Sequence, residues 1–93
     1  MAQARRIDQW LFFARVVKTR SLAQKLVEAG HVRINKAKIH KPGYAINPGD
    51  IITVALHGHV KVLKVLDPGT RRGPATEAQD LYEDLSPPAA FPV

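Results

Sequence analysis

The sequence predicts an α+β fold in which two packed N-terminal helices lie on a small, mainly antiparallel sheet, followed by a C-terminal helix. Three observations predict the helix pair and the sheet. Apolar residues recur at helical spacing up to residue 29, the period changes to two after Gly30, and two β-branched runs follow, separated by a short polar turn. The chain has 93 residues, which suffice for one small domain with a single core.

The first helix is expected over residues 7–17, where the apolar residues keep helical spacing. These residues are Ile7, Trp10, Leu11, Ala14 and Val17, and Phe12 and Phe13 widen the stripe. We assign Trp10 and Phe13 to the core, because aromatic residues on an apolar stripe usually pack inside; stacking of the aromatics on nucleic-acid bases is the alternative. Asp8 is expected to cap this helix or to pair with a nearby arginine.

A second helix is expected over residues 21–29. Ser21 and Gln24 have the spacing of a capping box, in which the hydroxyl accepts from a backbone amide and the Gln24 side chain reaches back. Gly30 is expected to end the helix, because glycine adopts the left-handed conformation without steric cost. The connection between the two helices is short, so we expect them to pack against each other.

The pattern after the second helix is typical of antiparallel strands. Residues 32–34 alternate apolar and polar side chains, Asn35-Lys36 has the composition of a tight turn, and Ile39 lies in a short strand beyond it. Proline and glycine predict further turns at residues 41–43 and 47–50. Two β-branched runs then predict a hairpin of central strands: residues 51–56 and 60–66, joined by His57-Gly58-His59.

The last third of the chain is expected to pack on this unit. Residues 71–74 are expected to form an exposed basic link, and a helix is expected over residues 76–85 with Thr76 as its cap. That helix would carry four carboxylates and no Lys or Arg. We therefore divide the chain into residues 5–66, a domain of helix pair and sheet; residues 67–85, the link and helix packed on it; and residues 86–93, a proline-rich flexible tail.

Charge is distributed unevenly along the chain. Residues 1–41 hold ten of the fourteen Lys and Arg residues but only two of the eight carboxylates, which gives this segment a net charge of +8. Like charges repel in a compact state, so the usual reason to keep such an excess is a polyanionic partner. Nucleic acid is the leading hypothesis, and scattered cations that only solvate the surface are the alternative.

Composition disfavours several classes of protein. There is no cysteine for disulfides, thiolate metal sites or nucleophiles, and no apolar run long enough to cross a membrane. The N-terminus lacks a signal-peptide core, so a cytoplasmic location is expected. Neither a carboxylate pair nor a phosphate-cradling glycine loop is visible, so we expect no enzyme activity, cofactor or small-molecule substrate. His57 and His59 lack a third ligand nearby, so they are interpreted as hairpin residues rather than a metal site.

The residues that suit a nucleic-acid partner fall into two groups. Charge, hydroxyls and free backbone amides meet at the start of the second helix, which favours a phosphate. A second group comes from the strand and turn after Gly30, and it extends the same basic face if that strand packs beside the second helix. With two arginines near the N-terminus, the candidates are Arg5, Arg6, Lys18, Thr19, Arg20, Ser21, Lys25, Arg33, Asn35, Lys36, Lys38 and Lys41.

Two other partners fit the sequence less well. A helix-turn-helix protein that reads DNA needs base-reading side chains along its second helix, which here offers only Gln24, Lys25 and Glu28. A helix that binds a membrane surface carries its Lys and Arg residues on one face, whereas here the basic residues also lie on turns and a strand. We therefore expect RNA gripped by its backbone, and six neutralised phosphates would give a slope of log affinity against log salt of about −4.

The order of the residues resembles the RNA-binding domain named after the fourth protein of the small ribosomal subunit. The resemblance covers about residues 5–56 and combines a helix pair, a glycine stop and a Val-x-Ile-Asn strand. It implies the alpha-L RNA-binding motif. The matching segments are Arg6-Ile7-Asp8, Trp10-Leu11, Ala14-Arg15, Lys18-Thr19-Arg20-Ser21, Ala23, Val27, Gly30-His31-Val32-Arg33-Ile34-Asn35, Lys41-Pro42 and Gly49-Asp50.

The second half resembles the bacterial heat shock protein 15 family, in the segments Arg71-Arg72-Gly73-Pro74-Ala75, Glu77-Ala78 and Leu81-Tyr82-Glu83. The resemblance implies a ribosome-associated stress-response protein. It implies binding to structured ribosomal RNA and to large subunits blocked by a nascent chain still attached to transfer RNA. The candidate residues that it carries over are Arg6, Lys18, Thr19, Arg20, Lys25, Arg33, Asn35, Lys38 and Lys41.

Three departures from the family pattern stand out. Gln9 replaces a usual lysine and Lys36 a usual glycine, and an acidic segment with Ser86-Pro87-Pro88 stands where the family has a long basic extension. We expect a monomer. The interpretation from another class is an adaptor, in which the acidic helix over residues 76–85 docks a protein while the basic face only anchors the chain to RNA.

Overall fold

A computed structural model of the chain describes residues 5–56 and 58–86. Its helices are α1 (Ile7–Phe13), α2 (Arg20–Glu28) and α3 (Ala75–Ala78), and a 3-10 turn, η1, covers Gln79–Leu81. Its strands are β1 (Arg5–Arg6), β2 (Val32–Ile34), β3 (Ala37–Ile39), β4 (Ala45–Ile46), β5 (Ile51–Leu56), β6 (His59–Val65) and β7 (Tyr82–Asp84).

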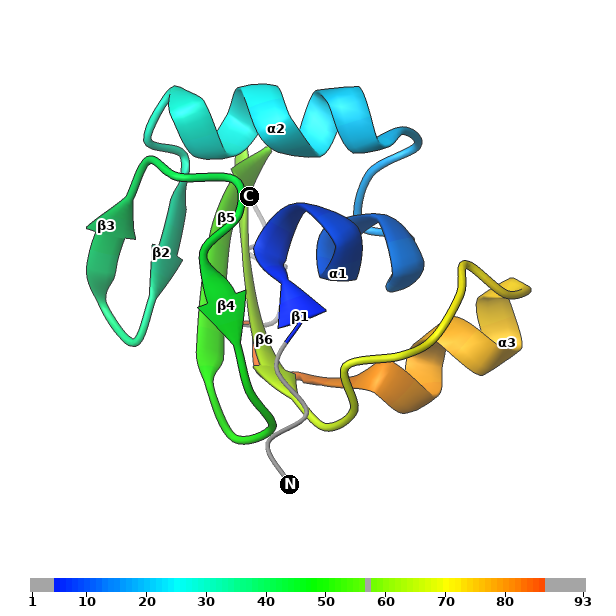
Figure 1. Ribbon diagram of the computed structural model, residues 1–93. Helices are drawn as coiled ribbons and strands as arrows, with labels where there is room; N and C mark the ends of the chain where they lie inside the picture. The colour runs from blue at the N-terminus through cyan, green and yellow to red at the C-terminus, as the bar shows by residue number, and fades with distance from the viewer. Residues whose placement is uncertain (1–4, 57, 87–93) are drawn as a thin grey trace.

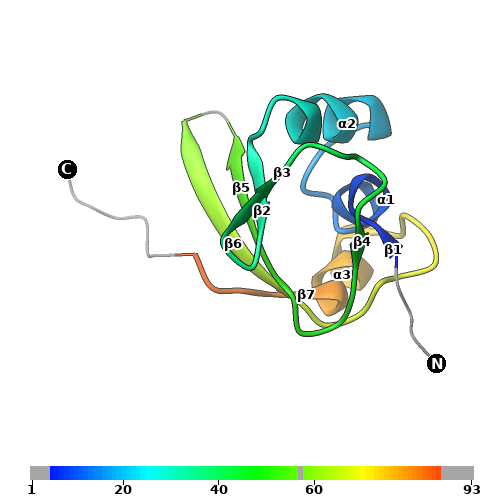
Figure 2. The same cartoon turned by 60° about the vertical axis from the view of Figure 1, so that its left-hand side comes forward.

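These elements form two layers. One layer is a five-stranded antiparallel sheet in the order β3-β2-β5-β6-β7, and a separate pair joins β1 to β4. The helices α1 and α2 cover one face of the larger sheet, and no helix in the described ranges covers the other face (Figure 1, Figure 2). The predicted α+β fold is confirmed. No helix within the described ranges has the length and apolar character that a membrane span needs.

The core lies between the helix pair and the larger sheet. In β5 the buried Ile52 and Val54 face the helices, and Thr53 between them faces the open side. Trp10 of α1 is fully buried, and its Nε1–H donates to the backbone oxygen of Asp67 at 3.1 Å. The core assignment of Trp10 is confirmed, and burial leaves its ring no surface for stacking on bases.

The predicted turns that frame β2 are confirmed. Gly30 follows α2 with a φ of +81°, and Asn35 and Lys36 join β2 to β3 with φ values of +51° and +75°. Positive φ at both central residues is the geometry of a two-residue hairpin turn whose twist matches that of its strands. Asparagine tolerates this geometry, but a lysine there is strained.

The first helix is shorter than the prediction over residues 7–17. It ends at Phe13, and Arg15 has a φ of +60°, a left-handed conformation that an α-helix does not continue. Val17 is nevertheless buried, because the chain folds back so that its amide donates to the Leu11 oxygen at 3.4 Å. Apolar burial therefore continues beyond the helix, which is why the spacing predicts a helix that is too long.

The cap of α2 is Thr19 and not Ser21. Thr19 Oγ1 accepts from a backbone amide of the first turn at 3.1 Å, and Ser21 is exposed. Gln24 does not reach back to the helix start, because its Nε2 donates to Asp8 Oδ2 at 3.2 Å. The predicted capping box is wrong: the preceding threonine supplies the cap, and a buried carboxylate binds the glutamine.

The predicted helix over residues 76–85 is wrong beyond its first turn. Pro74 occupies the cap position in place of Thr76, and α3 continues into η1. Residues 82–84 then form β7, which pairs with β6 so that Glu83 lies opposite Lys64.

The edge of β6 explains this difference. The β7 segment hydrogen bonds along it, and the Leu85 amide just beyond donates to the Val62 oxygen at 2.8 Å. Ala78 and Leu81 are buried, and their spacing suits a helix as well as a turn that leads into a strand. Of the predicted tail, residues 87–93 lie outside the described ranges.

Candidate nucleic-acid interface

A buried carboxylate organises the junction between α1 and α2. Asp8 is fully buried and accepts hydrogen bonds from both helices and from the residue before α1. Its donors are Arg6 Nε at 3.0 Å and Nη2 at 2.9 Å, the Gln9 amide at 2.8 Å, Gln24 Nε2 at 3.2 Å and Arg20 Nη2 at 3.5 Å. One carboxylate therefore fixes two arginines and the relative position of the two helices.

The ionisation of Asp8 determines the charge of this junction. Burial raises its pKa, but hydrogen bonds from Arg6 and Gln24, the charge of Arg6 and the Gln9 amide together hold the pKa below the ordinary value of 3.8. The carboxylate is therefore ionised at neutral pH. The side chains of Arg6 and Arg20 are 50% and 41% exposed, so both also reach solvent. Two cations and one carboxylate leave the junction positively charged.

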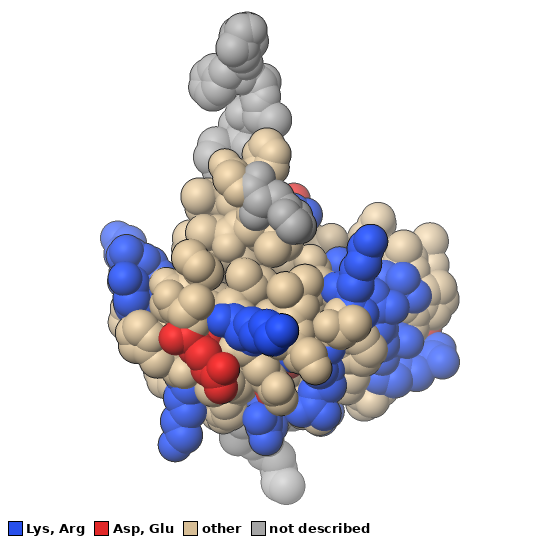
Figure 3. Space-filling view, turned by 90° about the horizontal axis from the view of Figure 1, so that it is seen from above, with Lys and Arg blue, Asp and Glu red and all other residues tan. Residues whose placement is uncertain are grey.

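Three exposed lysines lie around this junction. Lys18 precedes α2, Lys25 projects from it, and Lys41 precedes Pro42, whose oxygen accepts from the Asp8 amide at 3.3 Å. Within residues 5–56 and 58–86 no carboxylate pairs with these lysines. Figure 3 shows Lys and Arg around the face that α2 forms, with one prominent acidic group among them. We call this set the junction cluster: Arg6, Lys18, Arg20, Lys25 and Lys41.

A second set of cations lies on the β2–β3 hairpin. Arg33 and Lys38 are cross-strand partners, and both side chains leave the sheet on the face away from the helices. Val32 and Ile34 on either side of Arg33, and Ile39 after Lys38, are buried on the opposite face. Lys36 is exposed at the turn. The Lys38 stem passes Gly30 at the end of α2, where its Cδ lies 3.3 Å from the position of an added Cβ. We call Arg33, Lys36 and Lys38 the hairpin cluster.

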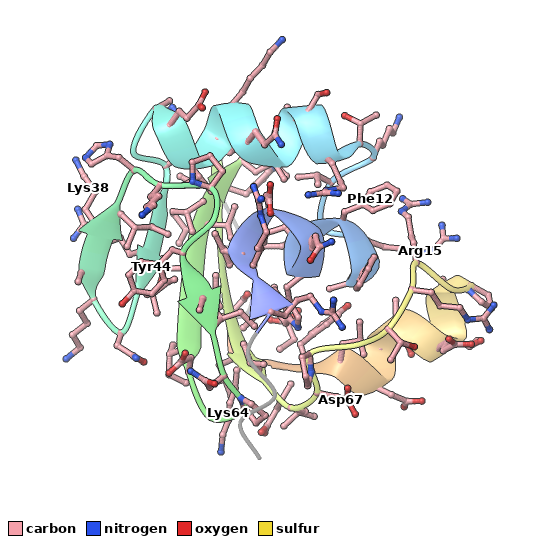
Figure 4. The ribbon with its side chains drawn as sticks, viewed as in Figure 1. Phe12, Arg15, Lys38, Tyr44, Lys64 and Asp67 are labelled. Atoms are coloured by element: carbon pink, nitrogen blue, oxygen red, sulfur yellow. The ribbon has the colours of Figure 1, made fainter. Side chains whose placement is uncertain are left out.

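The predicted basic face therefore has two parts that lie on different sides of the sheet. The junction cluster belongs to the helix layer, and the hairpin cluster begins on the open face of the sheet and reaches the end of α2 at Lys38. In Figure 4 the Lys38 side chain projects from the outer edge of the sheet, far from the connection that carries Arg15. The β2–β3 hairpin pairs with β5 and does not lie along α2. The two clusters therefore do not form one flat surface along α2.

Besides Arg6, Thr19 and Arg20, two further predicted contact residues have partners within the fold. Arg5 Nη2 donates to the Gly69 oxygen at 2.7 Å. Asn35 Nδ2 donates to Asp50 Oδ1 at 3.1 Å, and its Oδ1 accepts from the Ile51 amide at 2.9 Å. These bonds tie distant segments together, so Arg5 and Asn35 hold the positions of other groups.

Sequence reasoning did not assign Arg15, Arg71 or Arg72 to the site, and the fold ties Arg15 and Arg72 together at the end of α1. Arg15 Nε donates to the Gly73 oxygen at 2.7 Å, and Arg72 Nε donates to the Phe12 oxygen at 3.1 Å. The predicted exposed link over residues 71–74 is wrong for Arg72, which is partly buried, and for Gly73, which is buried. The signal was the doublet Arg71-Arg72 in an otherwise acidic half of the chain, but the partners of Arg72 are 55 and 60 residues away.

The described ranges contain no group of three His, Cys, Asp or Glu side chains that could hold a metal ion. His59 is exposed at the start of β6, and His57 lies outside the described residues. Within the described residues, the candidate site is therefore a set of cations on the helix layer and the β2–β3 hairpin.

Known proteins resemble this chain in both fold and sequence. The family model of the S4 domain matches residues 5–52. A solved structure described as a trimeric structure of Vibrio cholerae Heat Shock Protein 15 superposes with a TM-score of 0.82 at 36% identity, covering 88% of this chain and 82% of that one. The expected monomer stays a prediction beside this trimeric relative.

Curated relatives agree with this match. The Heat shock protein 15 homolog of Aeromonas salmonicida is 40% identical over 79 residues, which cover 85% of this chain and 59% of the relative. The Small ribosomal subunit protein uS4 of a Bradyrhizobium strain is 36% identical over 50 residues, or 54% of this chain and 24% of the relative. The chain thus spans about 60% of the length of the heat shock relatives that it matches. Because fold and sequence agree over most of its length, the chain belongs to the heat shock protein 15 family and carries an S4 domain over residues 5–52.

Proposed function

We propose that the chain binds structured RNA through the junction cluster and the hairpin cluster. The observation that carries the proposal is a set of six exposed cations without a carboxylate partner in the described ranges, beside two arginines fixed on a buried aspartate. These six are Lys18, Lys25, Arg33, Lys36, Lys38 and Lys41. Family membership supports the proposal, because the resemblance implies an RNA-binding domain.

The chemistry of the two clusters suits phosphate oxygens more than base edges. Arginine presents a planar fork of donors that matches phosphate geometry, and lysine supplies a mobile point charge. A-form RNA hides its base edges in a narrow major groove, so proteins recognise it largely by shape and backbone. We expect Arg20→Ala to weaken binding to many RNAs alike. Loss of affinity for one RNA alone would instead indicate base readout.

The partner that we propose is ribosomal RNA of the large subunit, in a cytoplasmic protein that handles subunits blocked by a nascent chain on transfer RNA. This finer role rests on the family resemblance and on the basic clusters. The protein is proposed to act by binding, without a catalytic step, cofactor or metal.

Cosedimentation with separated ribosomal subunits at two salt concentrations tests the proposal. The test variant is Lys18→Ala with Lys25→Ala and Lys41→Ala, which leaves the Asp8 hydrogen bonds intact. The control is Lys61→Ala with Lys64→Ala on β6, which removes two lysines that belong to neither cluster. Salt-sensitive association with large subunits that only the test variant loses would support the proposal. Binding to short structured RNAs but to neither subunit would retain RNA binding and reject the ribosomal role.

The adaptor interpretation has no specific observation in its favour. Its acidic residues lie on α3, η1 and β7 and not along one helix. Glu77 pairs with Arg71, and Asp84 Oδ1 accepts from the Ser86 amide at 2.8 Å. A truncation after Gly73 would also remove an edge strand of the sheet, so loss of a partner would not distinguish docking from unfolding.

A further inference from the structure

The segment over residues 67–74 is bound to the helix layer by arginines from both sides. Arg5 and Arg15 donate to its backbone at Gly69 and Gly73, each at 2.7 Å. In return Arg72 donates to two carbonyls at the end of α1 and the turn beyond: Nε to the Phe12 oxygen at 3.1 Å and Nη2 to the Val17 oxygen at 3.4 Å. These reciprocal bonds fix a loop that is distant in sequence beside the α1–α2 connection.

This arrangement concentrates positive charge that the sequence distributes over two segments. We call the set the arginine ledge: Arg15, Lys18, Arg71 and Arg72. Arg15 and Lys18 are exposed, and the Arg71 side chain is 67% exposed. In Figure 3 the largest group of Lys and Arg lies on the right, the side of the α1–α2 connection in Figure 1. Figure 4 shows Arg15 directed toward the loop that contains residues 67–74.

We propose that the arginine ledge binds phosphates of the same RNA and extends the interface beyond the S4 match at residue 52. This inference rests on the proposed function. Arg72 donates to the oxygen of Val17, the residue before Lys18, and Lys18 directly precedes the α2 cap Thr19, so the ledge meets the junction cluster at the start of α2. Because that continuity joins the ledge to a surface assigned to RNA, an RNA strand fits better than a separate acidic protein.

The four cations have different roles on the ledge. Arg15, Lys18 and Arg71 reach solvent and are the phosphate contacts. Arg72 is a positioning residue, because its donors bind carbonyls and its guanidinium lies 4.7 Å from the Phe12 ring centre. It holds the loop that presents Arg71.

Glu77 reduces the positive charge that the arginine ledge presents. Its carboxylate accepts from Arg71 Nε at 3.1 Å and from Arg71 Nη2 at 2.8 Å, which occupies the fork that a phosphate would use. An added Cβ at Gly73 would lie 2.6 Å from the same carboxylate, so the Glu77 carboxylate is packed against the loop. RNA therefore competes with Glu77 for Arg71, and removing this carboxylate charge should tighten binding.

Fluorescence anisotropy with a labelled ribosomal RNA stem-loop across a salt series tests the ledge. Arg15→Gln and Arg71→Gln should each weaken binding severalfold and reduce the magnitude of the salt slope by about 0.7 to 0.9, the value for one lost phosphate contact. Lys64→Gln removes the same charge from β6 and should change neither quantity by as much. Thermal unfolding of each variant separates loss of contact from loss of fold, and Arg71 is the cleaner site because its bonds are at the surface.

A charge-matched pair tests the competition. Glu77→Gln should raise affinity by a few fold relative to Glu83→Gln, which removes one carboxylate from β7. Equal affinities would overturn the role of Glu77. If wild type binds RNA and the triple lysine variant loses it, but Arg15→Gln and Arg71→Gln match Lys64→Gln, the ledge inference fails while the proposed function stands. No RNA binding by wild type would reject both, and binding of poly-glutamate that only the ledge variants lose would assign the ledge to an acidic protein.

Discussion

The junction of α1 and α2 and the β2–β3 hairpin are both basic, but they hold their cations differently. At the junction a buried carboxylate binds Arg6 and Arg20, so their positions are fixed before any partner arrives. On the hairpin Arg33 and Lys38 stand on an exposed sheet face, without a carboxylate partner in the part of the chain that the structure describes. The first region offers defined geometry and the second offers mobile charge.

The number of charges alone therefore does not determine how much each region contributes to binding. A fixed arginine loses little conformational freedom when it binds a phosphate, whereas a long free side chain must be ordered. Mobile cations still contribute to long-range attraction and to the salt dependence of binding. We therefore expect substitutions of Arg6 and Arg20 to affect both folding and binding, whereas loss of a hairpin charge should weaken binding independently of its effect on folding.

The largest expected effect is at the centre of the junction. Asp8→Ala should lower the free energy of unfolding by about 2–3 kcal/mol, because it removes the charged acceptor of a buried hydrogen-bond network and leaves Gln24 without its partner. Urea denaturation measures it. Glu28→Ala, which removes an exposed carboxylate from α2, should stay within about 0.5 kcal/mol of wild type. Equal effects of the two substitutions would show that the junction is not organised by Asp8.

The same carboxylate predicts a pH dependence. The folded pKa of Asp8 lies below its ordinary value of 3.8, so its stabilising contribution is complete well above pH 3.8 and is lost as the pH falls through the folded pKa. The stability difference between wild type and Asp8→Asn should be constant from about pH 7 to pH 5 and should shrink below about pH 4. Urea unfolding of both proteins across this range measures it, and a constant difference at pH 3 would contradict the assignment.

These two tests address what the sequence did not reveal about the site. Local patterns predicted the α2 stop at Gly30, the turn at Asn35-Lys36 and the excess of charge, because each depends on neighbouring residues. The pairing of Asp8 with Arg6 is also local, and the expected pairing with a nearby arginine is confirmed. The other partners of Asp8 were not predictable, because Arg20 and Gln24 lie 12 and 16 residues away and the helix packing decides that they meet it. The arginine ledge depends on still longer separations.

The fold shows the same limit. The apolar spacing of residues 7–17 extends beyond α1, because an irregular turn buries Val17 as well as a helix would. The β7 strand arises from pairing with β6, and no local pattern in residues 82–84 requires it. Local periodicity therefore identified buried residues such as Val17 and Leu81, but it did not determine where a helix ends, because turns and strand pairing bury the same residues.

A smaller effect is expected at the start of α2, where the hydroxyls of Thr19 and Ser21 lie two residues apart in sequence. Thr19→Ala should destabilise the protein by about 1 kcal/mol, because Thr19 Oγ1 caps the helix. Ser21→Ala removes an exposed hydroxyl and should change stability by less than about 0.5 kcal/mol. Thermal or urea unfolding distinguishes them, and the reverse ranking would restore Ser21 as the cap.

The smallest effect, with the opposite sign, is expected on the hairpin. Lys36→Gly should raise the free energy of unfolding by about 0.5 kcal/mol, because glycine relieves the strain of a φ of +75° and part of this gain is offset by the greater freedom of the unfolded chain.

Lys38→Gly is the matched control for that substitution, since it removes the same charge from an extended strand. It should lower stability by about 0.5–1 kcal/mol. Both variants should weaken RNA binding to a similar, modest extent and reduce the magnitude of the salt slope by at most about 0.9. Similar losses of affinity with opposite changes in stability would show that the hairpin contributes charge independently of fold stability. If affinity instead followed stability, the hairpin would resemble the junction, and the contrast between the two regions would be wrong.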